Sequence, residues 1–164
     1  MMIKKKTVLL RRLARLPSIN IFIGSSSAAK SQAKEFVKTF TNNVVSFVPW
    51  WDAFTAGRSL LDGLDDVRKK VQGAVLLFSP EMETTVRKKE QDIPNLNVLF
   101  ELGYFYSYFS KERVAMIKYG DFYLSSDLDG YLWIFGSKCF RRARKQVIGK
   151  RTKSEFKRWI IAVS

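Results

Sequence analysis

The chain has 164 residues, of which 46% are hydrophobic and 14% aromatic, enough for one globular domain with a sizeable core. It has no histidine and a single cysteine, Cys139, which excludes Cys/His zinc sites, internal disulfides and Ser-His or Cys-His catalysis. Enzyme chemistry would have to use carboxylates, hydroxyls, lysine, arginine or tyrosine. The apolar runs are far shorter than the ~18 residues of a membrane span, and the N-terminus lacks the long apolar region and cleavage site of a signal peptide. We therefore expect a cytoplasmic protein with no membrane association.

The net charge of +14 is concentrated at the two ends of the chain. Residues 1–16 carry six Lys/Arg and no acid, and residues 137–164 carry ten Lys/Arg and one acid, whereas residues 17–136 carry thirteen basic and fourteen acidic residues. The ends could bind nucleic acid through phosphates, but solvated basic tails are the favoured interpretation because charge runs at termini are commonly tails. The predicted organisation is a basic N-terminal extension (1–16), a neutral domain (17–136) and a basic C-terminal segment ending in a helix (137–164).

The first predicted strand covers 19–23 and ends at Gly24. Ser25, Ser26 and Ser27 follow, and we expect Ser27 or a neighbour to N-cap the next helix. That helix is predicted from apolar residues at three- and four-residue spacing: Ala29, Ala33, Phe36, Val37 and Phe40. A second strand is predicted over 44–48, stopped by Pro49.

Residues 50–57 are predicted to form a loop, and the next helix is indicated by Leu60, Leu64, Val67 and Val71. A buried strand over 74–78 ends at Ser79 and Pro80. The polar, charge-rich stretch 81–92 is predicted to be a mobile surface loop. After it, Pro94 and Asn95 are start signals for an apolar helix that carries Glu101.

Two further strands are predicted over 114–117 and near 131–135. Thr152 and Glu155 have the spacing of a capping box, which predicts a final helix. Its apolar residues are Phe156, Trp159, Ile160 and Val163. Short apolar runs that alternate with amphipathic helices are typical of an α/β sandwich with a mostly parallel sheet.

Glu101 is the only formal charge between Ile93 and Ser110. Its neighbours at helical spacing are Asn97, Val98, Tyr104, Phe105 and Tyr108, so at least one side of the carboxylate lies against apolar or aromatic groups. A buried carboxylate is costly unless it is used. The alternative is a solvent-facing residue near the helix start, where the macrodipole favours negative charge.

The unusual residues of the chain follow the carboxyl ends of predicted strands, where ligands bind in open α/β sheets. The turn of Gly24, Ser25 and Ser26 offers N–H groups and hydroxyls to a phosphate. It lacks the glycine spacing of a dinucleotide fingerprint and the lysine of a P-loop. Helix capping alone would also explain a serine at this position. Trp50, Trp51 and Phe54 could stack on a planar base or a pyridinium ring. The alternative is that one or two of them are core residues and a third packs under the loop. We expect one of the two tryptophans to line a pocket.

Taken together, these segments resemble the bacterial TIR-like (Toll/interleukin receptor homology) effector domains of antiphage defence, including those fused to STING-type or cyclic-pyrimidine sensors. The resemblance covers about 17–136 and rests on 21–27, 51–60, 94–103 and 126–130, in that order. The most specific part is the run from Asn97 to Gly103. The resemblance implies a flavodoxin-like three-layer sandwich with a five-stranded, mostly parallel sheet.

The resemblance also implies NAD+ glycohydrolase activity, the cleavage of the bond between nicotinamide and ribose, with Glu101 as the catalytic residue. NAD+ would be the substrate, and no cofactor or metal would be needed. Residue chemistry agrees, because a pyridinium leaving group is already positively charged and needs no general acid, so one carboxylate can suffice. The substrate-binding residues on this interpretation are Gly24, Ser25, Ser26, Trp51, Asp52, Phe54 and Asn97.

Self-assembly into a homo-oligomer is the implied mode of activation, with residues 51–59 as the gate and a sensor in another chain or domain. The chain departs from the family at Asn95 and Leu96, where an Arg-Asp pair is usual, and after the third strand, where Pro80, Glu81 and Met82 replace an acidic pair. These departures predict a less organised loop ahead of the catalytic glutamate. They favour, as an alternative, a non-catalytic nucleotide-binding or scaffold module.

Two further alternatives remain at this point. The basic termini favour a nucleic-acid-binding protein, although the neutral body and the lack of a binding motif do not. Nucleoside deoxyribosyl transfer also uses a glutamate near a ribose, so residue type alone does not separate it from NAD+ cleavage.

Overall fold

Five parallel strands form one sheet in the computed structural model, which describes residues 18–54, 56–128, 133–137 and 148–164. The strand order is β2-β1-β3-β6-β7. The strands are β1 (Ile19–Ser25), β2 (Val45–Pro49), β3 (Gly73–Phe78), β6 (Val114–Tyr119) and β7 (Trp133–Ser137). The three central strands, β1, β3 and β6, are almost entirely buried because helices cover both of their faces. Predictions that concern 1–16, Thr55, 129–132 or 138–147 lie outside the described residues.

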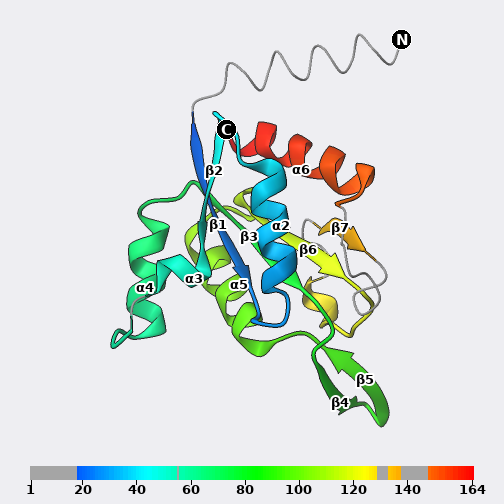
Figure 1. Ribbon diagram of the computed structural model, residues 1–164. Coiled ribbons are helices and arrows are strands. Elements are labelled where there is room, and N and C mark those ends of the chain that lie inside the picture. Colours follow the sequence, from blue (N-terminus) through cyan, green and yellow to red (C-terminus); the bar gives the residue numbers. More distant parts are fainter. Residues whose placement is uncertain (1–17, 55, 129–132, 138–147) are drawn as a thin grey trace, which may run out of the picture.

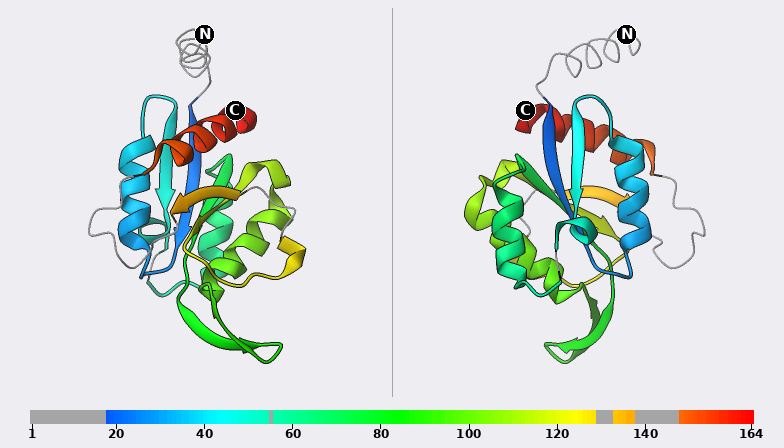
Figure 2. Two further views of the ribbon diagram at one scale, coloured as in Figure 1. Left: turned by 90° about the vertical axis from the view of Figure 1, so that its right-hand side faces the viewer. Right: turned by 60° about the vertical axis from the view of Figure 1, so that its left-hand side comes forward.

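Helices cover both faces of the sheet and make the molecule a three-layer sandwich (Figures 1 and 2). One face is covered by α2 (Lys30–Phe40) and α6 (Lys150–Val163), whose Phe36 and Phe156 rings meet edge to face at 4.8 Å. The other face is covered by α3 (Trp50–Ala53), α4 (Leu60–Arg68) and α5 (Leu96–Tyr108). The predicted flavodoxin-like α/β fold is confirmed, and every strand pair of this sheet is parallel.

The prediction of a mobile loop over 81–92 is wrong, because these residues form an antiparallel hairpin that projects from the sandwich (Figure 1). Its strands are β4 (Met82–Val86) and β5 (Lys89–Ile93). The two-residue turn is made by Arg87 and Lys88, which both have positive φ, at 50° and 66°. Turns of this kind normally use asparagine or glycine, so the usual sequence signal for a hairpin is missing here.

The predicted loop at 50–57 begins instead with the helical turn α3, directly after Pro49. The capping box at the last helix is also wrong. The helix α6 starts at Lys150, and the side chains of Thr152 and Glu155 bind strand β7: Thr152 Oγ1 donates to the Phe135 carbonyl at 2.5 Å, and Glu155 Oε2 accepts from the Phe135 N–H at 2.8 Å. These two side chains therefore fasten α6 to the edge of the sheet.

Short 3₁₀ turns lie at Lys111–Arg113 and Ser126–Leu128. The start of α2 also differs in detail from the expectation of a serine N-cap. The helix begins after Ala29, and Ser26 Oγ accepts a hydrogen bond of 3.1 Å from the Ala29 N–H. Within the described ranges, no helix has both the length and the apolar character needed to cross a membrane.

Candidate functional site

Helix α5 carries the residue that the sequence marked as unusual. Its start is fixed by Asn95, whose Oδ1 accepts a hydrogen bond of 2.9 Å from the Asn97 N–H. The face toward the sheet buries Val98, Leu102 and Phe105 together with Glu101, a residue that is only 5% exposed. The prediction of a carboxylate among apolar groups is confirmed, and the solvent-facing alternative is wrong.

The carboxylate of Glu101 lies on the backbone of strand β1 at Gly24. A β-carbon placed on Gly24 would lie 2.4 Å from Glu101 Oε2 and 2.4 Å from the Leu76 side chain. No atom can occupy that space, so glycine is required here for close approach and not for backbone conformation. The first strand and the helix α5 therefore meet at Gly24 and Glu101.

Burial raises the pKa of Glu101 from 4.5 to about 8. Glu101 Oε2 is a buried atom that has no hydrogen-bond partner among the described residues. A buried carboxyl oxygen without a donor is destabilising, and native structures keep such groups mainly where they have a task. This combination makes Glu101 the strongest candidate for a catalytic group in the part of the chain that the structure describes.

Glu101 lies at the point where the strand order reverses. Strands β1 and β3 are neighbours in the sheet. After β1 the chain continues to β2 on one side of this pair, and after β3 it continues to β6 on the opposite side. Ligands of open α/β sheets bind at such a switch point, beyond the carboxyl ends of the strands. Here those ends are formed by Ser25 and Ser26 after β1 and by Ser79 after β3.

A second carboxylate, Glu81, joins the elements around this switch point. The hydroxyl of Ser26 donates to Glu81 Oε1, and the hydroxyl of Ser79 donates to the same oxygen at 2.9 Å. Asn95 Nδ2 donates to Glu81 Oε2 at 3.2 Å. One carboxylate therefore connects the end of β1, the end of β3 and the start of α5.

These contacts overturn the expectation of a poorly organised loop ahead of Glu101. Glu81 and Asn95 are two of the positions at which the chain departs from the family pattern, and they bind one another. Sequence reasoning named Glu81 only as part of a departure from the family pattern and gave it no role at the site. Glu81 lies only a few residues beyond the carboxyl end of β3, so the expectation that ligands bind at the carboxyl ends of strands would have pointed to it.

Trp50, not Trp51, is the tryptophan that contacts the serine turn. Its Nε1 donates to Ser25 Oγ at 2.9 Å, and the ammonium of Lys30 lies 5.2 Å from the centre of its ring. Trp51 packs partly against the core on the opposite face of the sheet. The hydroxyls of Ser25 and Ser26 are buried and bonded within the protein, so they do not form an open phosphate cradle.

The remaining predicted site residues are more dispersed. Asp52 is exposed on α3, and Asn97 is exposed on α5, one turn before Glu101. Phe54 packs over Gly63, where a β-carbon would lie 2.5 Å from its ring, and its ring is 6.4 Å from that of Phe22. Phe54 is therefore a packing residue of the α3–α4 connection. Of the predicted binding residues, Gly24 lies against Glu101, and Ser25 and Ser26 follow it in the chain but bind Trp50 and Glu81.

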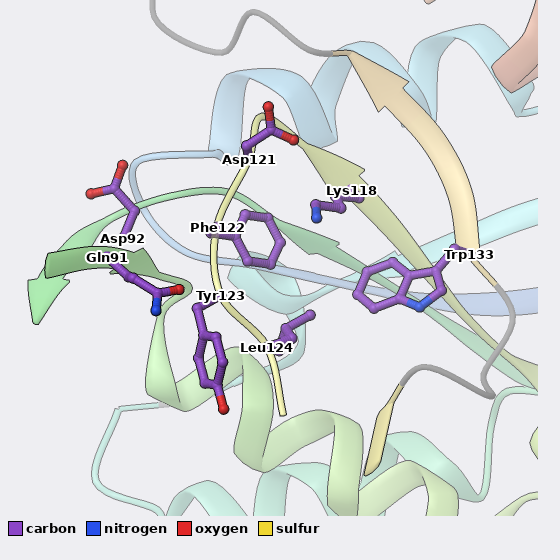
Figure 3. A pocket seen from close by; sticks show the side chains of 8 residues that line it. All are labelled: Gln91, Asp92, Lys118, Asp121, Phe122, Tyr123, Leu124 and Trp133. Atoms are coloured by element: carbon purple, nitrogen blue, oxygen red, sulfur yellow. The ribbon is translucent and has the colours of Figure 1, made fainter. Parts of the chain in front are cut away.

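A cleft of about 610 Å³ opens at the carboxyl end of β6, beside the hairpin (Figure 3). It is lined by Gln91, Asp92, Lys118, Asp121, Phe122, Tyr123, Leu124 and Trp133. Glu101 is not among these residues. Sequence reasoning did not indicate this cleft, because its residues come from three separate segments.

Comparison with known proteins gives a consistent result. The TIR domain model of CAP12/Pycsar effector proteins matches residues 20–137. The chain is similar to "CD-NTase-associated protein 12" of Sphingobacterium faecium, at 34% identity over 110 residues, which are 67% of this chain and 34% of that protein. The protein of the same name from a Lachnospiraceae bacterium is 31% identical over 110 residues, covering 67% of this chain and 35% of the relative.

A third relative is the Pycsar effector protein PaPycTIR of Pseudomonas aeruginosa. It is 31% identical over 99 residues, covering 59% of this chain and 29% of the relative. The matched stretch thus spans about a third of the length of each of these curated relatives.

Proposed function

The chain belongs to the TIR domain family of CAP12/Pycsar effector proteins, and from that premise we propose that it is an NAD+ glycohydrolase acting as an effector of antiphage defence. The observation that carries the proposal is Glu101, a buried carboxylate with an unbonded oxygen at the switch point of the sheet. A sensor of the activating signal would belong to another chain or to a further domain.

The proposed reaction needs little from the protein beyond charge and position. When the bond between nicotinamide and ribose breaks, its electron pair leaves with the pyridinium nitrogen, which becomes neutral nicotinamide, and no general acid is required. Positive charge then develops on the ribose. The carboxylate of Glu101 would stabilise that oxocarbenium-like transition state and bind ribose hydroxyls, and water would complete hydrolysis to ADP-ribose.

The high pKa of Glu101 fits this role. Burial favours the neutral acid in the empty site. A cationic nicotinamide riboside moiety brought against the carboxyl group would favour its ionised form. Substrate would thus generate the charge that stabilises its own transition state.

Activation by self-assembly is supported by apolar groups that the described fold leaves exposed. Leu61 on α4 is 52% exposed and Phe100 on α5 is 46% exposed, and both helices lie on the face that contains Glu101. Exposed apolar residues on neighbouring helices favour association. Because the Glu101 side chain is only 5% exposed, access to it requires movement, and α3 is the candidate gate because Trp50 ties it to Ser25.

A non-catalytic TIR module that signals by assembly is the second candidate. The same low exposure of Glu101 favours it, since a site that never opens would have no substrate. Nicotinamide release distinguishes the two.

The test is incubation of the purified protein with NAD+, with and without a crowding agent that promotes assembly, followed by measurement of nicotinamide. We expect release by the wild type and a loss on the order of a hundredfold or more in Glu101→Gln, which keeps the shape but removes the charge. Glu83→Gln, an exposed position on the hairpin, is the control. If Glu101→Gln retains most of the wild-type rate, Glu101 has a structural role and the proposal fails.

A further inference from the structure

The cleft at the end of β6 contains Lys118, which forms no ion pair with any of the described residues, although Asp92 and Asp121 also line the cleft. The ammonium of Lys118 lies 4.8 Å from the centre of the Phe122 ring. Figure 3 shows the Lys118 ammonium pointing between the rings of Phe122 and Trp133, with the Asp92 carboxylate pointing away from Phe122. A half-buried cation against the face of Phe122, with the Trp133 ring nearby, is suited to an anionic ligand that carries a planar ring.

The backbone around Lys118 is shaped to present this side chain. The pairing of β6 with β7 shifts register between Lys118 and Tyr119, and such irregularities commonly redirect a side chain beside a binding site. Gly136 makes the close approach feasible, because a β-carbon there would lie 2.7 Å from the Lys118 carbonyl oxygen. Beyond β6, Gly120 turns the chain with φ of 74°, and the Tyr123 N–H donates to the Asp92 carbonyl at 2.7 Å.

The cleft and Glu101 lie on the same face of the sheet. Gly24 pairs with Leu76, Leu76 with Met116, and Met116 with Trp133, so these residues form one row across four strands. Glu101 lies over the first residue of that row, and Trp133 at its other end lines the cleft. Three strand intervals correspond to about 14 Å, which is a separation that an extended dinucleotide can bridge but a single nucleoside cannot.

We propose that this cleft binds the adenosine diphosphate half of NAD+ while the nicotinamide riboside half reaches Glu101 of the same chain. The inference rests on the proposed function. Lys118 would contact the pyrophosphate. Trp133, Phe122 and Tyr123 offer faces for the adenine ring.

Lys118→Gln tests the phosphate contact, with Lys38→Gln on the exposed side of α2 as the matched control. The first measurement is binding of ADP-ribose to the full chain by calorimetry, which requires no cleavage. We expect the dissociation constant to rise roughly tenfold or more in Lys118→Gln and to be unchanged in Lys38→Gln. Tyr123→Ala, which removes a ring without altering charge, is expected to weaken ADP-ribose binding as well.

The second measurement separates binding from chemistry. Lys118→Gln is expected to raise the KM for NAD+ by a factor similar to its effect on ADP-ribose, with kcat changed less than about threefold. Cleavage of nicotinamide riboside, which has no phosphate, is expected to be unchanged. A merely structural role for Lys118 would reduce the cleavage of both substrates together.

Some outcomes would overturn the inference. If Lys118→Gln and the wild type bind ADP-ribose with equal affinity, the cleft is not the binding site for the adenosine diphosphate half, even if nicotinamide release is normal. Recovery of activity on mixing Glu101→Gln with Lys118→Gln would mean that the cleft serves a neighbouring chain, which contradicts the same-chain arrangement. ADP-ribose binding that depends on Lys118, without nicotinamide release under any condition, would support the cleft and reject the NAD+ glycohydrolase proposal instead.

Discussion

The carboxylate of Glu101 fills the space that any side chain at position 24 would need. A β-carbon on Gly24 would lie 2.4 Å from Glu101 Oε2, far inside the contact distance of the two atoms. The position of the candidate catalytic group on α5 therefore depends on Gly24 of strand β1, a residue that is distant from it in the sequence.

Gly24→Ala should accordingly displace Glu101 and damage the site. We expect destabilisation of about 1–3 kcal/mol from overpacking and a loss of nicotinamide release much larger than the loss of folded protein explains. Gly103→Ala is the matched control, because a β-carbon there meets no atom within 4 Å. That change, in the exposed part of α5, should be neutral or stabilise by up to about 1 kcal/mol. Thermal unfolding and initial rates of both variants check the prediction, and full activity in Gly24→Ala would contradict it.

The raised pKa of Glu101 predicts how stability depends on pH. Its pKa is about 8 in the folded chain against 4.5 for an exposed glutamate, so between these values the folded state binds a proton more tightly than the unfolded state. The contribution of this group to the free energy of unfolding then falls as pH rises from about 4.5 to about 8. In Glu101→Gln this dependence is absent, so the Tm of the variant relative to wild type should increase across that window and level off outside it.

The ionisation of Glu101 should also appear in the pH dependence of activity, which is expected to rise with pH where the stability falls. Since only the ionised carboxylate stabilises the transition state, kcat/KM should rise with pH and level off above about 8. The kcat profile, which reports the complex with a cationic substrate, should level off at lower pH. A kcat/KM profile that is flat from pH 5 to pH 9 would contradict a buried, substrate-ionised Glu101.

The bonds of Glu81 to Ser26, Ser79 and Asn95 predict that it positions the start of α5. Glu81→Gln removes the charge and replaces one acceptor oxygen by a donor. We expect a loss of about 1–2 kcal/mol of stability and a fall in kcat of roughly tenfold at a temperature where the variant is fully folded. Glu83→Gln should change neither quantity. Equal stability and rate in Glu81→Gln and wild type would show that these bonds do not organise the site.

Dependence on assembly can be measured as the rate per enzyme across a dilution series, with mass recorded in parallel. We expect specific activity to rise steeply with concentration in the wild type. Leu61→Asp, at a side chain that is 52% exposed on α4, should keep the chain monomeric, folded and nearly silent. Phe54→Asp would be a poorer test, because Phe54 packs over Gly63 and its loss would disturb folding. A constant rate per enzyme in a strictly monomeric wild type would reject the assembly model.

The sequence alone determined the helices and strands that have a clear hydrophobic pattern, either a short apolar run or a helical spacing of apolar residues. The short, mainly apolar runs at 19–23, 74–78 and 114–117 became β1, β3 and β6, and the helix that begins after Asn95 became α5. The isolated charge of Glu101 in an apolar helix indicated apolar groups on at least one side of the carboxylate, and the structure then decided between burial and a solvent-facing position in favour of burial. Local hydrophobic pattern carries this information because each residue's side of a strand or helix is set by its own chain position.

Only the tertiary structure decided which segments meet around the candidate site and along the sheet edges. The hairpin at 82–93 forms although Arg87 and Lys88 are poor turn residues. Glu155 binds strand β7 instead of its own helix start, and Trp50 is chosen over Trp51 for the contact with Ser25. Glu81, Lys118 and Trp133 acquire their roles through pairings between segments far apart in the chain. Such pairings depend on strand order, register and backbone approach, which the periodicity of one segment does not encode.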